Sequence, residues 1–452
     1  MTSRRRIAIT GLGSVTGFGV GFDSFWQGML QARSCIRPIA RFRPDGFRCR
    51  LAAEVLDFSA KDFVPKHYRK AVKVMARDIE LAVAAARDAV LDAKLVTRGT
   101  SDGADAAPTY AGERMGCHVG AALIAAEAEE LTTALATARA PGSEQFDLAR
   151  WGDSEGGQAA MNNLQPLWLL KYLPNMLACH VTIIHGCEGP SNTITCADAS
   201  GLLSLGESAR VIERGDADAC LSGGAQTDIN HMSLMRLELT RRVAETGDAT
   251  DPRQILKPFS PASRGGLVGE AGAIVVLEDL DRAVGRGARV YAELAGFGAA
   301  QSSAPAYPPF DSMSGAADGL SDAIESALRD AHASPEEIDA IVPHAAGLTA
   351  WDRAEADAIV RVFGERAGRL PLFTITPNTG DGRAASGVLG VALAAKILST
   401  GQSPARLGVS DPILNLLAGD APAGDATHLR TVLVCTPSEG GHHAAVVLRR
   451  VG

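Results

Sequence analysis

Residues 194–206 read ITCADASGLLSLG: a short run of β-branched residues, a turn of small residues and an apolar helical repeat. This order predicts a strand up to Cys196, a tight turn, and a helix that ends at Gly215. Turns of this shape commonly expose a nucleophile. The residue at the sharpest point is Asp198, however, and Cys196 precedes it by two positions. The turn therefore predicts a functional site with an acid where a nucleophile is expected.

The alternation of strand and helix continues along the chain. Residues 7–10 (IAIT) predict a buried strand that ends in a Gly-rich turn, and residues 271–280 predict a strand covered on both faces. Helices are predicted at residues 75–95 and from Asp352, which forms a capping-box-like start with Glu355. Because strands alternate with helices, we expect mostly parallel sheets with sites at the carboxyl ends of their strands.

Several segments do not fit this alternation. Residues 97–114 and 137–157 are small, polar and rich in Gly or Pro, and they predict irregular insertions. Residues 222–226 (SGGAQ) predict a Gly-rich turn, which is not a phosphate loop because no Gly-Lys-Ser/Thr follows. Residues 163–184 (NLQPLWLLKYLPNMLACHVTII) are unusually apolar and predict either core or a face that a second subunit covers.

Composition bounds the class of protein. The 452 residues are enough for a large core and for two domains or two fused half-domains. A content of 46% hydrophobic and 21% charged residues is typical of a well-packed α/β protein. The net charge of −8 argues against a general nucleic-acid binder, because such a protein needs a basic face. No nucleic-acid partner is therefore expected.

Cysteine spacing and hydropathy indicate the compartment. The eight cysteines show no C-x-x-C or zinc-finger spacing, which predicts scattered, mostly buried, reduced thiols in a cytosolic protein and no metal site. The apolar part of the N-terminal segment is too short and Gly-rich for a signal peptide. No run of about 18 uncharged apolar residues is present, so we expect no membrane span and a cytoplasmic location.

Four blocks together resemble the β-ketoacyl-[acyl carrier protein] synthases of the thiolase superfamily. The blocks are RRRIAITGLGSVTGFG (4–19), GPSNTITCADASGLLSLGESARVIERGDADACLSGGAQT (189–227), KPFSPASRGGLVGEAGAIVVLEDLDRAVGRGARVYAELAGFG (257–298) and DRAEADAIVRVFG (352–364). The resemblance runs from about residue 5 to residue 450. It implies an α/β fold, the thiolase-like five-layer α-β-α-β-α sandwich of two similar halves (residues 1–270 and 271–452), each with a five-stranded mixed sheet, and dimeric assembly.

The resemblance also assigns the positions of the family's catalytic residues, which are a Cys nucleophile, two His and a Lys. Aligning Ser200 and Gly201 with the end of the family pattern T-A-C-x-S-G places Asp198 at the position of the Cys. His344 retains the first His, whereas TPNTGD places Asp381 at the second His and a Thr at the Lys. The nucleophile and the second His are therefore both replaced by Asp.

Further departures lie at the C-terminal end, where the family pattern G-F-G-G-T-N is GGHHAA. Gly441 stands at the aromatic position and Ala445 at the Asn. The adjacent His442 and His443 are expected to point apart in a strand, which disfavours a metal site. Glu270 is predicted to be a structural carboxylate beneath the site.

The replacements oppose condensation. The reaction needs a thiolate that accepts an acyl group, and two neutral imidazoles that stabilise an enolate. An acyl group on Asp198 would be a mixed anhydride that water cleaves readily. Loss of one oxyanion donor typically costs about 2.7–4 kcal/mol, and Asp381 would in addition place a negative charge beside the enolate. The chain is therefore expected to be a poor condensing enzyme by itself.

The resemblance favours a non-condensing subunit of the chain-length-factor type, which pairs with an active ketosynthase in type II polyketide or fatty-acid-like biosynthesis. Residues 344–364 (HAAGLTAWDRAEADAIVRVFG) look most like these subunits, although Gln is their usual residue where Asp198 stands. The partner would be a ketosynthase homologue in a heterodimer, or a second copy in a homodimer, and residues 160–180 would line or block the acyl tunnel. The alternative is a divergent synthase, acyltransferase or malonyl decarboxylase that is active alone, through Asp198 with His344 or through Cys196.

Each site residue also has a structural interpretation. Asp198 could cap the following helix by accepting a backbone N–H. Cys196 is expected to be a buried strand residue. His344, with Asp198 and Asp381 nearby, could form a buried charged network that keeps its imidazole protonated.

A basic cluster lies at the predicted start of a helix. Arg69, Lys70 and Lys73 could dock an acidic acyl carrier protein, since the matching segment does so in similar synthases, or they could be an ordinary solvated helix face. No cofactor is implied beyond the phosphopantetheine that arrives on the carrier protein.

Overall fold

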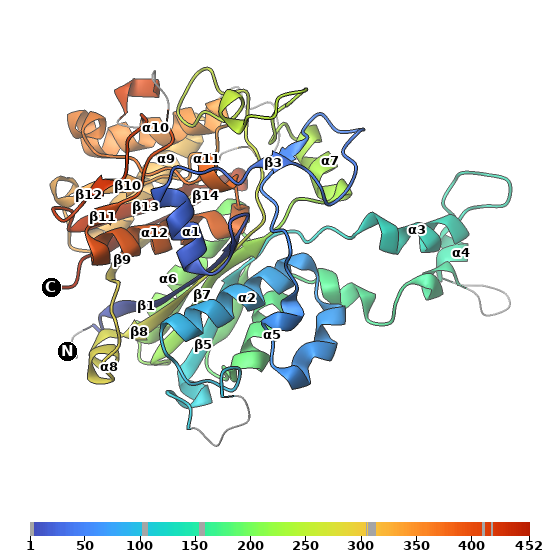
Figure 1. The fold of residues 1–452 in the computed structure, drawn as a ribbon, viewed down its shortest axis with the longest axis horizontal. Coiled ribbons are helices and arrows are strands. Elements are labelled where there is room, and N and C mark those ends of the chain that lie inside the picture. The colour runs from blue at the N-terminus through green and yellow to red at the C-terminus, as the bar shows by residue number, and fades with distance from the viewer. Residues whose placement is uncertain are drawn as a thin grey trace.

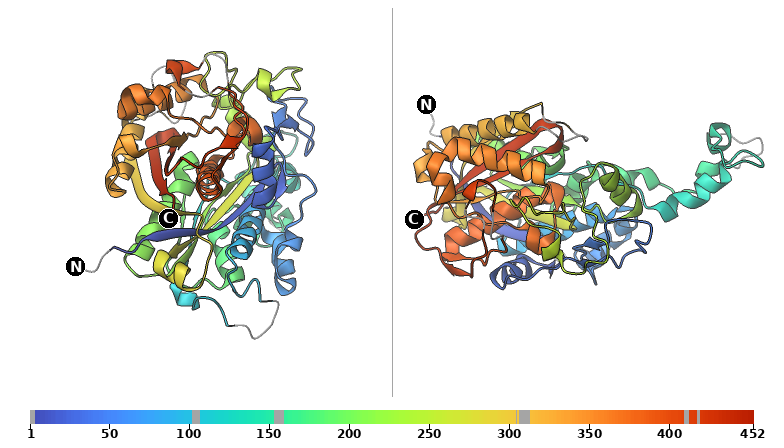
Figure 2. Two further views of the ribbon diagram at one scale, coloured as in Figure 1. Left: turned by 60° about the vertical axis from the view of Figure 1, so that its left-hand side comes forward. Right: turned by 90° about the horizontal axis from the view of Figure 1, so that it is seen from above.

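The computed structural model describes residues 4–101, 107–152, 159–303, 305, 313–408, 412–416 and 419–452. These residues form five layers (Figures 1 and 2). A pair of helices forms the central layer, strands lie on each side of it, and an outer layer of helices covers the strands on each side. The predicted thiolase-like α-β-α-β-α sandwich is confirmed. The layers matter for function because the candidate site lies where loops from both halves meet the central helices.

The first sheet belongs to the N-terminal half. Its strands, in spatial order, are β1 (Ile7–Thr16), β8 (Ala271–Asp279), β7 (Ala219–Gln226), β5 (Met115–Gly120) and β6 (Ser191–Ile194). Helices α2 (Arg77–Asp92) and α5 (Met176–His185) cover its outer face. Strand β8 follows residue 270 yet lies in this sheet. The predicted boundary between the two halves at residue 270 stays a prediction. Because β8 lies beside β1 and β7, the strand order favours a boundary after β8.

The second sheet belongs to the C-terminal half. Its strands, in spatial order, are β9 (Ala292–Gln301), β14 (His442–Arg449), β13 (Thr431–Pro437) and β10 (Ala340–Val342). Because β9 also pairs antiparallel with the start of β1, the two sheets are joined into one ten-stranded hydrogen-bonded sheet. Helices α9 (Ser314–Asp330) and α10 (Thr349–Phe363) cover its outer face, and α6 (Ser200–Glu213) and α12 (Ser386–Thr400) lie between the two sheets. Among the described residues this sheet has four strands rather than the predicted five, since Leu372 adds only an isolated bridge to Ile341.

The remaining elements are short or peripheral. They are α1 (Phe22–Leu30), α3 (Ala128–Thr137), α4 (Leu148–Gly152), α7 (His231–Leu239), α8 (Leu280–Gly285), α11 (Thr376–Thr379), β2 (Gly19–Val20), β3 (Arg37–Pro38), β4 (Leu51–Ala52), β11 (Gln402–Ser403) and β12 (Gly424–Asp425).

The buried strand β8 shows why the sequence forms layers. Val275 and Leu277 pack into the central helical layer, whereas Ile274 and Val276 face the outer layer of α2. A strand apolar on both faces needs cover on both sides, and this is what the run in residues 271–280 predicts. The expectation of mostly parallel sheets is wrong, however. Strands β1, β8, β9 and β14 pair antiparallel. Their sequences resemble those of parallel strands because burial of both faces requires a nearly continuous apolar run.

Two predicted Gly-rich turns are in fact strand. β1 continues through Gly13, where a Cβ would lie 2.1 Å from the carbonyl oxygen of Ala85 in α2. Residues 222–226 belong to β7, and a Cβ on Gly223 would lie 2.0 Å from the carbonyl oxygen of Ala273. These glycines allow neighbouring backbones to approach closely, which is a second use of Gly within strands.

The predicted insertions are only partly irregular. Of residues 97–114, the described part is a loop with one 3-10 turn at Gly112–Arg114, and residues 102–106 lie outside the described residues. Residues 137–157 include helix α4, and residues 153–158 lie outside the described residues. Helices α3 and α4 form an arm that projects from the body of the molecule (Figures 1 and 2).

The cysteines and the most apolar helix belong to the interior. All eight cysteines are free of disulfides, and only Cys179 and Cys196 are not buried, so the prediction of reduced, mostly buried thiols is confirmed. Among the described residues, Arg383–Thr400 is the segment with the length and composition of a membrane span, but it contains two charged residues and 78% of it is buried in the protein. Its apolar surface is therefore used in the central layer.

Candidate functional site

The turn around Asp198 has the predicted order of strand, turn and helix, with a shorter strand. β6 ends at Ile194, and residues Ala197–Ala199 form one 3-10 turn before α6. Cys196 is therefore beyond the strand, and its expected place within the strand is wrong. Ala197 has a φ of 48°, a left-handed conformation that tightens the turn and directs Asp198 inward, where it is 1% exposed.

Asp198 does not cap helix α6. The cap position is Ala199, and no side chain accepts a hydrogen bond from the first turn of the helix. The capping interpretation is therefore wrong, because both carboxylate oxygens have stronger partners elsewhere. Ser200 instead fixes the turn, accepting the N–H of Cys196 and donating to the carbonyl of Ala121.

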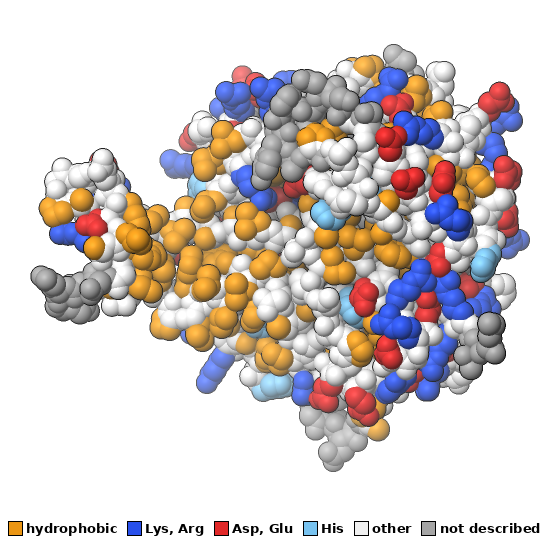
Figure 3. Space-filling model, turned by 180° about the vertical axis from the view of Figure 1, so that it is seen from behind, with side chains coloured by type: hydrophobic (Ala, Val, Ile, Leu, Met, Phe, Trp, Pro, Cys, Tyr) orange, Lys and Arg blue, Asp and Glu red, His pale blue; other side chains and the backbone are white. Residues whose placement is uncertain are grey.

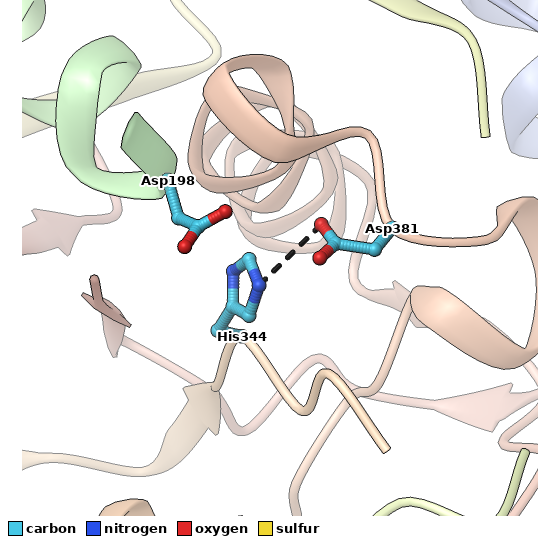
Figure 4. A group of neighbouring side chains, drawn as sticks. All are labelled: Asp198, His344 and Asp381. Atoms are coloured by element: carbon cyan, nitrogen blue, oxygen red, sulfur yellow. Dashed lines mark ion pairs between the residues drawn. The ribbon is translucent and has the colours of Figure 1, made fainter. Parts of the chain in front are cut away.

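The structure brings together the three residues that the resemblance assigns to the family's Cys and His positions. Asp198, His344 and Asp381 converge from separate segments, and one potential ligand atom of each lies within 4.8 Å of the others (Figure 4). His344 Nε2 lies 3.4 Å from Asp381 Oδ1 in a buried ion pair. All three side chains are buried.

Two buried arginines complete this cluster, and the sequence analysis did not identify them. Arg383 Nη1 lies 2.8 Å from Asp198 Oδ1, and Arg242 Nη2 donates to Asp198 Oδ2 at 3.1 Å. Arg242 and Arg383 are 5% and 3% exposed. A signal for Arg383 was present in the sequence, since this charged residue follows Asp381 by two positions and directly precedes the small and apolar residues 384–395. Arg242 carries no such signal.

Further carboxylates hold the arginines. Glu439, in the turn before β14, lies 2.9 Å from Arg383 Nη2 and 3.3 Å from Arg242 Nη1. Asp228 lies 3.5 Å from Arg383 Nε. The cluster therefore joins the turn before α6, the segment after α7, the loop before α12 and the turn before β14.

Burial and neighbouring charges set the protonation of the cluster. Burial by itself would lower the pKa of His344, but Asp381, followed by Asp198, raises the pKa to about 9. Burial would raise the pKa of Asp381, but His344 and then Arg383 hold this pKa well below its usual range. At neutral pH His344 is therefore a cation and Asp381 an anion. Neither is the neutral hydrogen-bond donor that stabilises an enolate in condensation.

Glu355 of the DRAE motif positions His344, and neither acid of the motif caps helix α10. The helix begins at Thr349 with Leu348 at the cap, so the predicted capping box is wrong. Glu355 accepts the backbone N–H groups of His344 and Ala345 at 2.8 and 2.9 Å. These bonds fix the loop after β10 and hence the direction of the imidazole.

The space beside Asp198 is small. A cavity lined by Asp198, Arg242, His344 and Trp351 has a volume of about 10 Å³, which is room for about one water molecule. Although three side chains of the cluster have ligand-type atoms, two guanidiniums and a protonated imidazole oppose binding of a metal cation. The arrangement favours an internal ion cluster.

The other residues singled out from the sequence lie around this cluster. Burial raises the pKa of Cys196, which lowers its thiolate fraction at neutral pH. His442 is partly exposed, whereas His443 is buried and bonds Ser302 Oγ at 2.7 Å, so the two do not share a ligand. Glu270 pairs with Arg41 and Arg77 and lines a separate cavity of about 420 Å³.

Three further positions at which the sequence departs from the family pattern lie in ordered parts of the fold. Thr376 donates to the carbonyl of Ala345, Ala445 is buried in β14, and Gly441 has a φ of 82° in the turn that carries Glu439.

The basic cluster lies on the surface. Arg69, Lys70 and Lys73 are exposed on a 3-10 helix, Lys66–Val74, which precedes α2. The segment is therefore a 3-10 helix rather than the start of the long helix, and all three cations are accessible to a partner.

Comparison with known proteins identifies relatives over the whole chain. The β-ketoacyl synthase N-terminal domain family matches residues 4–283, and the β-ketoacyl synthase C-terminal domain family matches residues 291–410. The chain is 27% identical over 455 residues to the 3-oxoacyl-[acyl-carrier-protein] synthase 2 of Staphylococcus aureus (strain COL), covering 100% of this chain and 99% of the relative. It is 31% identical over 457 residues to a β-ketoacyl synthase of the actinorhodin polyketide system of Streptomyces coelicolor, covering 99% of this chain and 89% of the relative.

Solved structures agree with this assignment. The ishigamide ketosynthase/chain length factor superposes with a TM-score of 0.81 at 27% identity, covering 100% of both chains. A β-ketoacyl synthase from Burkholderia phymatum STM815, at 23% identity, shares the fold with a TM-score of 0.80 over 99% of this chain. The chain belongs to the β-ketoacyl synthase family, and Asp198, which the resemblance assigns to that family's nucleophile position, lies in a buried ion cluster with Arg242 and Arg383.

Proposed function

We propose that this chain is a non-condensing, chain-length-factor-type subunit that pairs with an active β-ketoacyl synthase in type II polyketide or fatty-acid-like biosynthesis. The observation that carries the proposal is the pair of buried guanidiniums on Asp198. Both oxygens of this carboxylate are engaged by guanidiniums, which makes it a poor nucleophile toward a thioester.

The second half of the reaction is opposed by the same cluster. Enolate stabilisation needs hydrogen-bond donors aimed at the developing oxyanion. Asp381 is kept as a carboxylate by His344 and Arg383, and it can only repel that charge. The cavity beside Asp198 holds about one water molecule, which leaves no room for an acyl thioester in this conformation.

An apolar surface supports assembly with a partner subunit. Apolar side chains extend from the arm onto the body on the back of the molecule (Figure 3). Leu167 and Leu169, in the unusually apolar segment, are 64% and 60% exposed, so part of this segment is surface rather than core. Large exposed apolar areas commonly mark interfaces. The ishigamide relative is described as a ketosynthase/chain length factor, which supports a ketosynthase homologue as the partner.

The substrate would reach such a pair on an acyl carrier protein, as the name of the Staphylococcus aureus relative implies for that enzyme. The exposed Arg69, Lys70 and Lys73 offer an acidic carrier protein a docking surface on this chain.

The test uses the chain alone and together with a Cys-containing ketosynthase homologue, which is first sought in the neighbouring reading frames. Each preparation is incubated with acyl and malonyl carrier protein, and intact-mass spectrometry and release of carbon dioxide are measured. We expect a stable heterodimer with an acyl adduct on the partner's Cys alone. An adduct on this chain, or decarboxylation by the isolated chain, contradicts the proposal.

A pair of Cys variants tests the alternative that the chain is active without a partner. If Cys196 carried acyl groups, Cys196→Ser would abolish the adduct while Cys179→Ser would keep it. Formation only of a stable, active homodimer on co-expression would also refute the proposed pairing.

A further inference from the structure

The contacts of Asp198 are those of a bound carboxylate. Its Oδ1 atom faces Arg383 Nη1 at 2.8 Å, and its Oδ2 atom accepts from Arg242 Nη2 at 3.1 Å. Each oxygen therefore has its own guanidinium, the arrangement that favours a carboxylate over a spherical anion.

The two arginines have supports that do not depend on Asp198. Glu439 contacts both guanidiniums, and Asp228 lies 3.5 Å from Arg383 Nε. The guanidinium of Arg242 also lies over the ring of Trp351, 5.3 Å from its centroid. Side chains fixed from behind keep their positions when the group in front is removed, which is the condition for a preorganised binding site.

The pair also has unused binding capacity. Arg242 is 5% exposed, and its Nε atom has no hydrogen-bond partner among the described residues. Removal of Asp198 would take from Arg383 Nη1 and Arg242 Nη2 the carboxylate that each contacts, and a buried charge that loses a partner is costly. A cavity of about 10 Å³ lies beside Asp198 and Arg242, so the space for a ligand comes from the side chain that is removed.

We propose that Arg242 and Arg383 form a carboxylate-binding site that the chain fills with its own Asp198, and that the emptied site binds a small free carboxylate. The inference is independent of the proposed function, because it concerns binding within this chain and is read out without any enzymatic activity.

The size of the ligand follows from the side chain removed. Asp198→Ala removes the carboxylate group and keeps Cβ, so the vacated space matches formate. Asp198→Gly removes Cβ as well, so the vacated space matches acetate. Acetate in the Ala variant would place its methyl group against Cβ, and we expect it to bind more weakly there than formate.

The experiment measures thermal unfolding of the full chain in sodium formate, sodium acetate and sodium chloride at equal ionic strength. For Asp198→Ala we expect formate to raise Tm with the logarithm of its concentration above Kd, by roughly 3 °C at concentrations near 100 times Kd. For Asp198→Gly we expect acetate to raise Tm at least as much as formate. The wild-type chain, whose site is filled, should show the same Tm in all three salts.

Two control variants make the result specific. Asp198→Asn fills the space without the charge and should not respond to formate. Asp318→Ala removes an exposed acid that pairs with Arg361, and it should not respond either. Equal effects of formate and chloride on the Ala variant, or a formate effect on the Asn variant, would overturn the proposal. So would an Ala variant that stays unfolded in formate while the Asn variant folds.

Discussion

Asp198 Oδ1 lies 2.8 Å from Arg383 Nη1, and both side chains are almost completely buried. An ion pair of this length on the surface would contribute little, because water solvates both charges when they are apart. In the interior neither charge can be solvated, so each depends on the other. The replacement of a nucleophile by an acid is therefore tied to arginines elsewhere in the chain.

Removal of Arg383 is expected to destabilise the fold strongly. Arg383→Met leaves Asp198, Asp228 and Glu439 with one cation fewer, and breaking a buried pair costs about 3–5 kcal/mol. Urea unfolding of the wild type and the variant measures the difference. Arg361→Met, which breaks an exposed pair with Asp318, should cost less than about 1 kcal/mol and serves as the control. Equal losses for the two variants would show that the cluster does not stabilise the interior.

Stability should fall as pH rises through the range of His344. Its pKa is about 9 in the folded protein against 6.5 for the free side chain. A raised pKa stabilises the folded state fully below pH 6.5, and this contribution is lost as pH rises toward 9. We expect a loss on the order of 3 kcal/mol in the free energy of unfolding. Denaturant unfolding of the wild type and His344→Gln between pH 6 and pH 9.5 measures it, and the variant should lack this slope.

A variant of Asp381, the ion-pair partner of His344, provides the matched control. Asp381→Asn removes the carboxylate that raises the pKa of His344, so its stability should also lose the slope between pH 6.5 and 9. The Asp381 carboxylate has a depressed pKa, so its contribution is present above 3.8 and declines as pH falls below that value. A slope that persists in Asp381→Asn would show that another group titrates.

Buried neutral histidines should produce the opposite dependence at low pH. His185 is buried beside Thr97, and burial lowers its pKa to about 4 from 6.5. The unfolded chain takes up this proton first, so stability is fully present above pH 6.5 and falls as pH drops toward 4. The free energy of unfolding of His185→Gln should fall less than that of the wild type between pH 6.5 and pH 4, by on the order of 3 kcal/mol. Above pH 6.5 the two proteins should differ by a constant amount, and a difference that does not change down to pH 4 would contradict the prediction.

Carrier-protein binding should depend on the basic cluster. Reversing Arg69, Lys70 and Lys73 to Glu should weaken binding of an acidic acyl carrier protein by roughly tenfold or more at low salt, because several rim charges each contribute modestly. The effect should shrink at high salt and leave Tm unchanged, since all three side chains are exposed. Surface plasmon resonance at two salt concentrations measures it.

The control reverses three cations on another part of the surface. These are Arg329, Arg353 and Arg361, which are exposed and paired with neighbouring acids. The same loss of carrier binding in this variant would mean that net charge, rather than a docking surface, governs the interaction.

Local patterns were enough to predict much of the fold. The strand, turn and helix around Asp198, the strand β8 and the helix α2 follow from apolar periodicity, because these patterns report which faces must be buried. The glycines of β1 and β7 predict turns but lie in strands, since Gly marks a turn and a close backbone contact equally well. The possible helix cap at Asp198 is absent because long-range arginines, which local sequence does not reveal, take its carboxylate.

The sequence by itself determined the family and the presence of acids at the positions of the nucleophile and the second His, because both are recorded in contiguous motifs. Only the tertiary structure decided what those acids do. Arg242 follows Asp198 by 44 positions, and Arg383 lies in the other half of the chain. Folding brings their guanidiniums to one buried carboxylate, and the cost of leaving any of these charges unpaired holds them together.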